Sequence, residues 1–550
     1  MAYTIGIDFG TLSGRVMLLN VEDGQEVAVD VVPYEHGVLD RELPTGEPLP
    51  PDWALQHPKD YLEVIYRGIP SVISKGGVDP DEVVGIGVDF TSCTVLPTLR
   101  DGTPLCLVEG WEHRPHAWPK LWKHHSAQPL ADRMNQVARA RSESFLSRYG
   151  GAISSEWYFP KLLQIFEEDR EVYHASDRFL EAADWIVWHL TGRECRNSCT
   201  AGFKAMWSQD EGLPSADYFR AVHPQFENPA EKLGNQFHPL GTRAGALRAE
   251  VAARLGLRPS VAVAVGNVDA MVCVPSVGVT GPGTLVMVIG TSICHVAVSQ
   301  DEVRLPGITG VVRDGVLPGM FGYETGQAAV GDMFQWFVST LSQTDIQQSA
   351  ERLGRSVHDD LQQLAAEIPP GSHGLVVLDW WNGNRSILGD ADLSGVIMGL
   401  TLSTTYAEMY RALLESVAFG TRRILENFEQ HHLPMQKIAA CGGISHKNPL
   451  LMQIYADVCG VPVEVFASKE VPARGAAMFG AVAAGVFPTI QDAARRLASP
   501  VERVYYPHAE AQQVYDRVYQ LYHRLYHLLG DTHRALMHEA KQIRLDTVPR

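Results

Sequence analysis

An aspartate interrupts an apolar strand pattern in the segment IGIDFGTLSGR, residues 5–15. Asp8 follows two alternating isoleucines, and a turn rich in glycine and hydroxyl residues comes next. The backbone amides of such a turn can bind phosphate, and Thr11 and Arg15 would add a hydroxyl group and a positive charge. Because a carboxylate repels phosphate, Asp8 is a candidate to hold Mg²⁺ between them, directly or through water. A plain hairpin capped by an aspartate explains this segment equally well when it is taken alone.

Two more polar turns follow later in the chain. Gly290 and Thr291 lie in VIGTS, directly after an apolar run. Gly443 lies in CGGISHKN, where Asn448 precedes a proline that can begin a helix. The chain contains no Gly-x-x-x-x-Gly-Lys-Ser/Thr motif, which excludes a P-loop. One glycine-rich turn is weak support for phosphate binding, but three in this order indicate a polyphosphate that is held from two sides.

Strands must position these turns. Apolar runs predict a hairpin with strands at 4–9 and 16–20 and a second hairpin over 284–299. The segment 83–93 repeats the opening pattern, with an apolar strand, then Asp89, then small hydroxyl residues. Residues 437–465 predict a strand, a turn, a helix that ends at a glycine, and another strand. A strand–turn–strand unit in each half suggests two similar α/β domains.

The composition is that of an acidic globular protein with two or three domains. The chain has 550 residues, 45% of them hydrophobic, and a formal net charge of −18. This charge opposes binding to nucleic acids and anionic membranes. The N-terminus lacks a signal-peptide pattern, and the most apolar segment, 260–279, contains Asn267, Asp269 and Pro275, which favours a buried strand and a functional turn over a membrane span. We therefore expect no nucleic acid or membrane partner and a cytoplasmic location.

The cysteines and histidines give little support for a disulfide framework or a metal site. The eight cysteines have no paired spacing, so we expect reduced thiols, and Cys195 and Cys199 lack the second pair that a zinc site needs. His113 and His116 flank Pro115, which favours a loop over a metal-binding helix face. Near the C-terminus, four tyrosines at helical spacing predict an amphipathic helix that packs in the core rather than against a partner.

The three turns resemble the phosphate and adenosine motifs of the FGGY family of carbohydrate kinases, in the superfamily of actin, Hsp70 and hexokinase. The resemblance covers nearly the whole chain. Within the family it is strongest to members that phosphorylate L-ribulose, through LWKHHSA, ISSEWYFPK, CTAGFKAMW, VIGTSICH, ETGQAAVGDMFQWF and VVLDWWNGNRS. It implies an α/β fold of two ribonuclease-H-like domains with an active-site cleft between them. The implied parts are residues 1–260 for the sugar and the first phosphate hairpin, 261–500 for ATP, and a helical tail over 501–550.

The resemblance also implies roles for individual residues. Asp269, in GNVDA, matches the catalytic base, and a carboxylate within hydrogen-bond reach of a sugar hydroxyl can take its proton. Ser92, Lys204 and Glu324 match sugar-binding positions, and Asp8 would orient Mg²⁺. The positions matched to ATP binding are Thr11, Arg15, Gly290, Thr291, Gly331, Gln335, Gly443 and Asn448.

The activity that the resemblance implies is phosphorylation of L-ribulose at its 5-hydroxyl group with ATP and Mg²⁺. The product would be L-ribulose 5-phosphate, in L-arabinose catabolism, and the enzyme a cytoplasmic homodimer. Sugar specificity can depend on few contacts, so a related kinase of xylulose, ribitol or glycerol is an alternative. An actin- or Hsp70-like ATPase would share the hairpins without needing Asp269, Lys204 and Glu324 around a sugar. A catalytically silent regulator would not need both Asp8 and Asp269.

Overall fold

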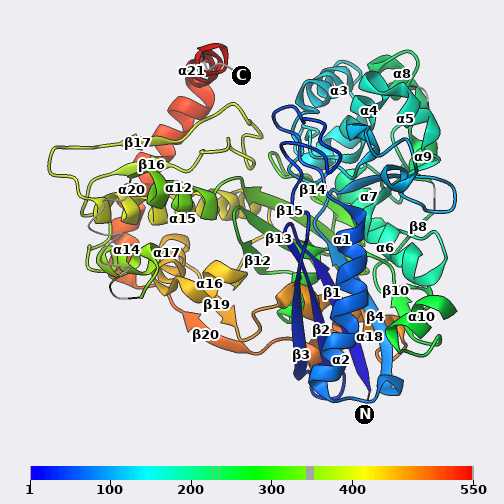
Figure 1. Cartoon of the computed structure of the whole chain (residues 1–550). Coiled ribbons are helices and arrows are strands. Elements are labelled where there is room, and N and C mark those ends of the chain that lie inside the picture. Colours follow the sequence, from blue (N-terminus) through cyan, green and yellow to red (C-terminus); the bar gives the residue numbers. More distant parts are fainter. Residues whose placement is uncertain (1, 227, 235, 342–351, 353, 548–550) are drawn as a thin grey trace.

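Two seven-stranded sheets, one in each half of the chain, form the framework of the protein (Figure 1). The computed structural model describes residues 2–226, 228–234, 236–341, 352 and 354–547. The first sheet has the order β3-β2-β1-β4-β10-β9, and β11 also pairs with β4. Its strands are β1 Tyr3–Phe9, β2 Ser13–Asn20, β3 Glu26–Pro33, β4 Val83–Phe90, β9 Arg243–Ala246, β10 Ala262–Ala264 and β11 Asn267–Val268.

The second sheet repeats the central arrangement of the first, with the order β14-β15-β13-β12-β18-β19-β20. In each sheet an antiparallel hairpin, β1–β2 or β12–β13, is extended on its other side by a parallel strand, β4 or β18. This order confirms the predicted α/β class and both predicted hairpins. The strands are β12 Thr284–Ile289, β13 Ile293–Ser299, β14 Gly310–Arg313, β15 Phe321–Gln327, β18 Lys437–Cys441, β19 Val463–Phe466 and β20 Val501–Tyr505.

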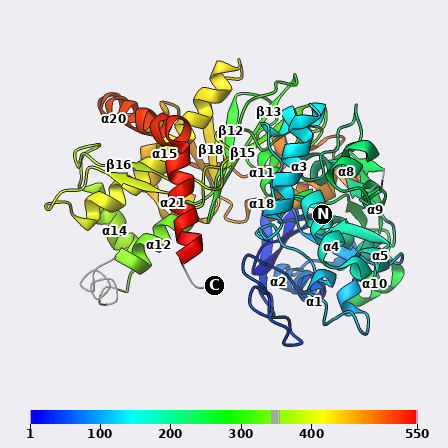
Figure 2. The ribbon, with the colours of Figure 1, turned by 90° about the horizontal axis from the view of Figure 1, so that it is seen from above.

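Helices of the first half cover its sheet and build a separate layer beyond it (Figure 2). They are α1 Pro58–Glu63, α2 Ile69–Gly76, α3 Gln128–Ala140, α4 Tyr158–Glu168, α5 Arg170–Ala175, α6 Ala182–Thr191, α7 Ser198–Lys204, α8 Ala216–Val222, α9 Ala230–Leu233 and α10 Ala249–Leu255. Two short strand pairs join this layer, β5 Val95–Thr98 with β6 Arg178–Glu181 and β7 Arg196–Asn197 with β8 Phe237–His238. The region 106–260 is mainly helix and loop.

The second half carries its own helices and one small strand pair, β16 Val376–Leu378 with β17 Val396–Met398. The helices are α11 Asp269–Ser276, α12 Gly331–Leu341, α14 Val357–Ala366, α15 Tyr406–Gln430, α16 Gly443–Lys447, α17 Pro449–Cys459, α18 Val471–Ala483, α19 Ile490–Leu497, α20 Ala509–His527 and α21 Arg534–Thr547. The predicted strand–turn–helix–strand unit is confirmed by β18, α17 and β19. Gly460 ends α17 with a φ of 70°, in the left-handed conformation that favours glycine.

Helix α18 comes from the second half but packs on the first sheet. Its backbone lies so close to β1 and β4 that the strands need glycine at the contact. A Cβ atom added to Gly6 would lie 1.8 Å from the carbonyl oxygen of Ala473, and one added to Gly87 would lie 1.8 Å from that of Ala476. The glycine- and alanine-rich composition of this helix thus joins the two halves.

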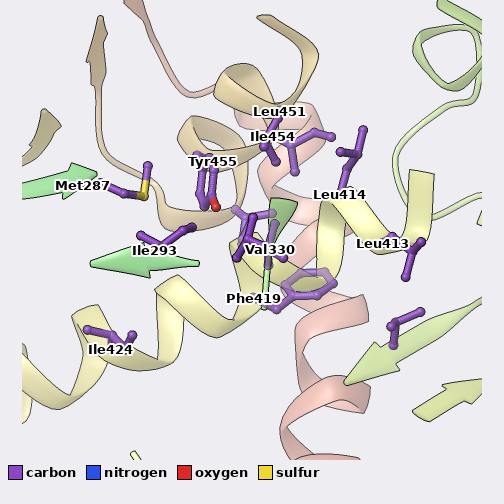
Figure 3. Packing of buried hydrophobic residues seen from close by; sticks show 14 of the residues in the cluster. Met287, Ile293, Val330, Leu413, Leu414, Phe419, Ile424, Leu451, Ile454 and Tyr455 are labelled. Atoms are coloured by element: carbon purple, nitrogen blue, oxygen red, sulfur yellow. The ribbon is translucent and has the colours of Figure 1, made fainter. Parts of the chain in front are cut away.

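The tyrosines near the C-terminus pack inward, as predicted. Tyr515, Tyr519, Tyr522 and Tyr526 lie on α20 and are buried in the core of the second half. The first three contact Phe419 of α15, and Tyr526 contacts Trp380. Figure 3 shows another part of the same core, where Phe419 lies near side chains of α17 and the second sheet. The segment after residue 500 therefore contributes both a strand and a core helix to the second half.

The described residues also test the predicted loop and thiols. His113 and His116 lie at a short turn, where His113 Nδ1 is 2.7 Å from Glu47 Oε1 and His116 Nε2 is 3.0 Å from Glu168 Oε2. All eight cysteines are free. Across the described ranges, no helix combines the length and apolarity needed to cross a bilayer.

Candidate active site

Three carboxylates meet at one edge of the first sheet. Asp8 on β1 lies opposite Asp89 on β4 in the parallel register, and Asn267 on β11 pairs with Asp89. Asp269 follows β11 directly and begins α11. Because the carboxyl ends of parallel strands share one edge of a sheet, this topology gathers acids that are far apart in the sequence.

Burial raises the pKa values of all three carboxyl groups. For Asp8, burial outweighs the opposing effect of Arg15, whose Nη1 lies 3.5 Å from Asp8 Oδ2. For Asp89, burial and then the charges of Asp8 and Asp269 raise the pKa well above its usual range. Burial, followed by the charge of Asp8, raises the pKa of Asp269 to about 7. Arg15, at Asp8 and Asp89, and Lys204, at Asp269, only partly offset these effects on the pKa values.

Asp89 tests whether a cation would fit at this edge. It is fully buried, and neither of its carboxylate oxygens has a hydrogen-bond partner in the part of the chain that the structure describes. A buried acid of this kind is costly unless a cation or a proton compensates it. Asp8 and Asp89 therefore fit a divalent cation such as Mg²⁺.

Asp8, Asp89 and Asp269 do not bring three ligand atoms within 4.8 Å of one another. Among the described residues, one group has three ligand atoms all within 4.8 Å of one another, and it lies elsewhere, at Asp390, Asp392 and His538. There, Lys541 Nζ is 3.0 Å from Asp392 Oδ1, so a protein cation already pairs with the group.

Lys204 and Glu324 form a buried ion pair next to Asp269. Lys204 ends α7 in the first half, Glu324 lies on β15 in the second, and Nζ is 2.8 and 2.7 Å from the two carboxylate oxygens. Burial opposes the charge of Lys204, but Glu324 raises its pKa. Both charges also act on the pKa of Asp269. The structure thus brings together three of the four residues that were expected around the sugar.

Ser92 lies just beyond the end of β4, in a loop held by a buried lysine. Lys161 of α4 donates from Nζ to the carbonyl oxygens of Cys93 and Leu121, at 2.6 and 2.9 Å. The Ser92 hydroxyl is buried and has no hydrogen-bond partner within the described residues, so it can serve a ligand. We call Ser92, Lys204, Asp269 and Glu324 the sugar side of the site.

The second phosphate turn is closed by the start of α12. Gly290 N donates to Ser292 O at 2.9 Å, and Val330 N donates to Thr291 O at 2.8 Å. A Cβ atom added to Gly331 would lie 2.6 Å from Gly290 O and 3.3 Å from Ile444 Cδ1. The close approach therefore joins the turn to the start of α12 and to α16. Gly290 and Thr291 are exposed.

At the third turn, Gly443 is open to solvent, whereas Asn448 is occupied in capping a helix. Gly443 is exposed and begins α16, whereas Asn448 is buried and accepts a hydrogen bond from Leu451 N at 2.9 Å, as the cap of α17. Gln335 is exposed on α12, with Oε1 3.3 Å from His358 Nε2. We call Gly290, Thr291, Gly331 and Gly443 the nucleotide side. Contacts of Asn448 and Gln335 with a nucleotide stay predictions.

Side chains from other parts of the chain hold the first phosphate turn. Trp122 Nε1 donates to Thr11 Oγ1 at 3.2 Å, and Gln56 Nε2 donates to Thr11 O at 2.9 Å. Arg15 also pairs with Glu470, from Nε to Oε2 at 3.0 Å. Asp89 was visible in the sequence as an acid that follows a second apolar strand. Trp122 and Lys161 lie in the family-like segments LWKHHSA and ISSEWYFPK, whereas Gln56 carries no such local signal.

Comparison with known proteins identifies the family. Residues 3–274 match the N-terminal domain of the FGGY family of carbohydrate kinases, and residues 285–484 match its C-terminal domain. The chain belongs to this family. It is 51% identical to a protein named ribulokinase from Anoxybacillus flavithermus, over 94% of this chain and 93% of that protein. A ribulokinase from Mycolicibacterium smegmatis is 47% identical, with 94% and 92% covered.

Solved structures agree with the FGGY fold. A xylulose kinase from Rhodospirillum rubrum superposes with a TM-score of 0.79 at 25% identity, covering 98% of this chain and 100% of that one. A glycerol kinase from Plasmodium falciparum with ADP gives a TM-score of 0.74 at 15% identity, covering 94% and 97%. The predicted family and fold class are confirmed. This FGGY kinase is an ATP-dependent phosphotransferase, and the reading as an actin- or Hsp70-like ATPase is not supported.

Proposed function

We propose that this FGGY kinase transfers the γ-phosphoryl group of ATP to the 5-hydroxyl group of L-ribulose. The observation that carries the proposal is the buried Lys204–Glu324 pair beside Asp269, in a chain about half identical to proteins named ribulokinase. The pair combines one residue from each half, so the sugar side is complete only when both halves meet.

Asp269 is suited to act as the general base. A base works best when its pKa lies near the working pH, and burial raises the pKa of Asp269 to about 7. The carboxylate can then take the hydroxyl proton as the oxygen attacks phosphorus. Lys204 has three ammonium protons, of which two point to Glu324, so one remains to orient a sugar oxygen.

The phosphates would lie between the two hairpin turns. Arg15 supplies charge beside the first turn, and exposed backbone groups at Gly290 and Thr291 form the second. Mg²⁺, when bound, supplies charge neutralisation for the phosphates, and Asp8 and Asp89 are the residues that would hold it. Polar groups from both halves surround the site. Closure of the two halves over the substrates would therefore also exclude water, which competes with the sugar as phosphoryl acceptor.

The decisive experiment is ADP release from Mg-ATP in the presence of single candidate acceptors. We expect strong turnover with L-ribulose over D-ribulose, D-xylulose, L-xylulose, ribitol and glycerol, and a product phosphorylated at the 5-position by NMR. Another preferred acceptor would keep the base and change the substrate. Turnover that ignores every sugar would overturn the proposal.

Two further expectations accompany this function. The reaction would serve L-arabinose catabolism, because its product is L-ribulose 5-phosphate. The enzyme would be a homodimer, which light scattering after size exclusion measures directly; a mass of about 60.6 kDa would instead indicate a monomer.

A further inference from the structure

A second ion pair joins the two halves beside the sugar side. Arg385, in the loop between β16 and β17, donates from Nη2 to Glu156 Oε1 at 3.4 Å. Glu156 lies just before α4, in the first half. The side chains are 23% and 21% exposed, so each can still be reached by a small ligand.

The loop that carries Arg385 is fixed to the strand that carries Glu324. Ser386 Oγ accepts a hydrogen bond from Gly326 N at 3.2 Å. Arg385 Cδ lies 3.5 Å from the place where a Cβ atom of Gly326 would be. Glu324 and Gly326 are two residues apart on β15 and so face the same side of the sheet. The stem of Arg385 therefore crosses the face from which Glu324 reaches Lys204.

Electrostatic effects connect Asp269 with both ion pairs. Lys204 and Glu324 act on the pKa of Asp269. Burial opposes the charge of Arg385, and Glu156 and then Glu324 raise its pKa. Burial likewise opposes the charge of Glu156, and Arg385, His125 and Lys204 lower its pKa. Glu324 thus acts on both Asp269 and Arg385, and Lys204 acts on both Asp269 and Glu156.

Glu156 and Arg385 use few of their hydrogen-bond acceptors and donors on each other, whereas Lys204 and Glu324 are bound closely to one another. The Lys204–Glu324 contacts measure 2.8 and 2.7 Å, whereas the single Arg385–Glu156 hydrogen bond is 3.4 Å, at the long limit for such a bond. A guanidinium group has five N–H donors, and a carboxylate has about four acceptor sites. His125 Nδ1 approaches Glu156 Oε1 only to 4.0 Å.

We propose that Glu156 and Arg385 bind the hydroxyl groups at the end of the sugar remote from Asp269, and so determine which sugars this kinase accepts. The inference rests on the proposed function, since the 5-hydroxyl group at Asp269 places the C1 end of a pentulose toward the second pair. A carboxylate and a guanidinium group together can accept from and donate to neighbouring hydroxyls, which suits a polyol end better than an apolar one.

The test compares L-ribulose with 1-deoxy-L-ribulose, which keeps the reacting hydroxyl group and lacks the remote one. For Arg385→Met and Glu156→Gln we expect kcat/KM with L-ribulose to fall about 10- to 100-fold, mainly through KM, as for loss of a charged hydrogen bond. The preference of the parent for L-ribulose over the deoxy sugar should fall toward one, and KM for ATP should stay unchanged.

A matched control separates sugar contact from closure of the two halves. The ion pair of Arg148 with Glu302, with Nε 3.5 Å from Oε1, also joins the two halves. The other partner of Arg148 is Glu211, which does not belong to the sugar side. Glu302→Gln should leave the sugar preference intact. Equal losses on both sugars, or the same loss in Glu302→Gln, would overturn the proposal.

Folding failure and a wrong substrate are distinguishable outcomes. If Arg385→Met does not fold, Arg385→Lys keeps the stem and charge but loses the planar fork, and a preference as strong as in the parent would then contradict the proposal. If the parent ignores L-ribulose but uses another sugar, the proposed function is wrong, and the same variants are assayed on that sugar and its deoxy analogue.

Discussion

The sugar side holds its charges on buried side chains, whereas the nucleotide side presents backbone groups at exposed turns. Lys204 and Glu324 are 6% and 9% exposed, yet Gly290, Thr291 and Gly443 are open to solvent. Buried charges must be compensated by one another, and their pKa values shift as a result. Backbone groups at a glycine turn need only the correct local conformation. We therefore expect the sugar side to respond mainly to changes of charge and hydrogen bonding. The nucleotide side should respond mainly to changes in side-chain volume.

The largest effect should come from removing the base on the sugar side. Asp269→Asn keeps the size of the side chain but cannot accept a proton from the sugar, and general-base loss costs about 10²- to 10⁴-fold in rate. We expect kcat to fall by that amount while KM for ATP changes little. Steady-state ADP release measures both. A variant that retains more than half of the parental kcat would show that another group takes the proton.

The next effect tests whether the Lys204–Glu324 pair is compensated charge. Lys204→Met leaves Glu324 buried without its partner, which costs about 3–5 kcal/mol in the free energy of unfolding. Lys204→Met combined with Glu324→Gln should recover most of that stability but none of the sugar-dependent turnover. Urea unfolding gives the first quantity and ADP release the second.

Equal stability of the single and double variants would contradict the compensation argument. Recovery of turnover in the double variant would show that the pair is structural and that the sugar does not contact it. Either result would weaken the contrast between the two sides of the site.

A third effect follows from the raised pKa of Asp269. Because the base must be ionised, kcat/KM for the sugar should fall about tenfold from about pH 8 to about pH 6, through the pKa of about 7. The raised pKa also means that the folded state binds more protons than the unfolded state between about pH 4 and 7, so this group's contribution to stability is lost as the pH rises.

Thermal unfolding of the parent and Asp269→Asn across this range isolates that contribution. The variant should gain stability relative to the parent as the pH rises. A constant difference between the two melting temperatures would mean that Asp269 titrates alike in the folded and unfolded chain.

Local patterns were sufficient for the hairpins and for the helix that ends at Gly460, because strand alternation, turn residues and a left-handed stop act within a few positions. They were insufficient for contacts between distant residues. Lys204 and Glu324 are 120 positions apart, and Arg385 and Glu156 are 229 apart. The first pair was expected only through the family resemblance. The second depends on a loop laid over β15, which no local pattern encodes.

Asp89 was only partly predictable from the sequence. Its strand-then-acid pattern matches that of Asp8, and the parallel pairing of β1 with β4 makes the two acids neighbours. The pattern was visible, but the register that joins the strands was not. The same limit applies to Trp122 and Lys161. Both lie in segments that resemble the family, but no local pattern shows that they hold turns on other elements.

The smallest effect should come from crowding the nucleotide side. In Gly331→Ala the new Cβ atom would lie 2.6 Å from Gly290 O, and the exposed turn must shift to admit it. Overpacking at a site that can relax costs about 1 kcal/mol, or about fivefold in affinity. We expect KM for ATP to rise by that factor with no change in KM for the sugar. Gly281→Ala is the matched control, since a Cβ atom there meets nothing within 4 Å. An equal rise in KM for the sugar and for ATP would show that the two sides shift together. In that case the sugar side and the nucleotide side would not differ in their response to substitution, although one uses buried charges and the other exposed backbone groups.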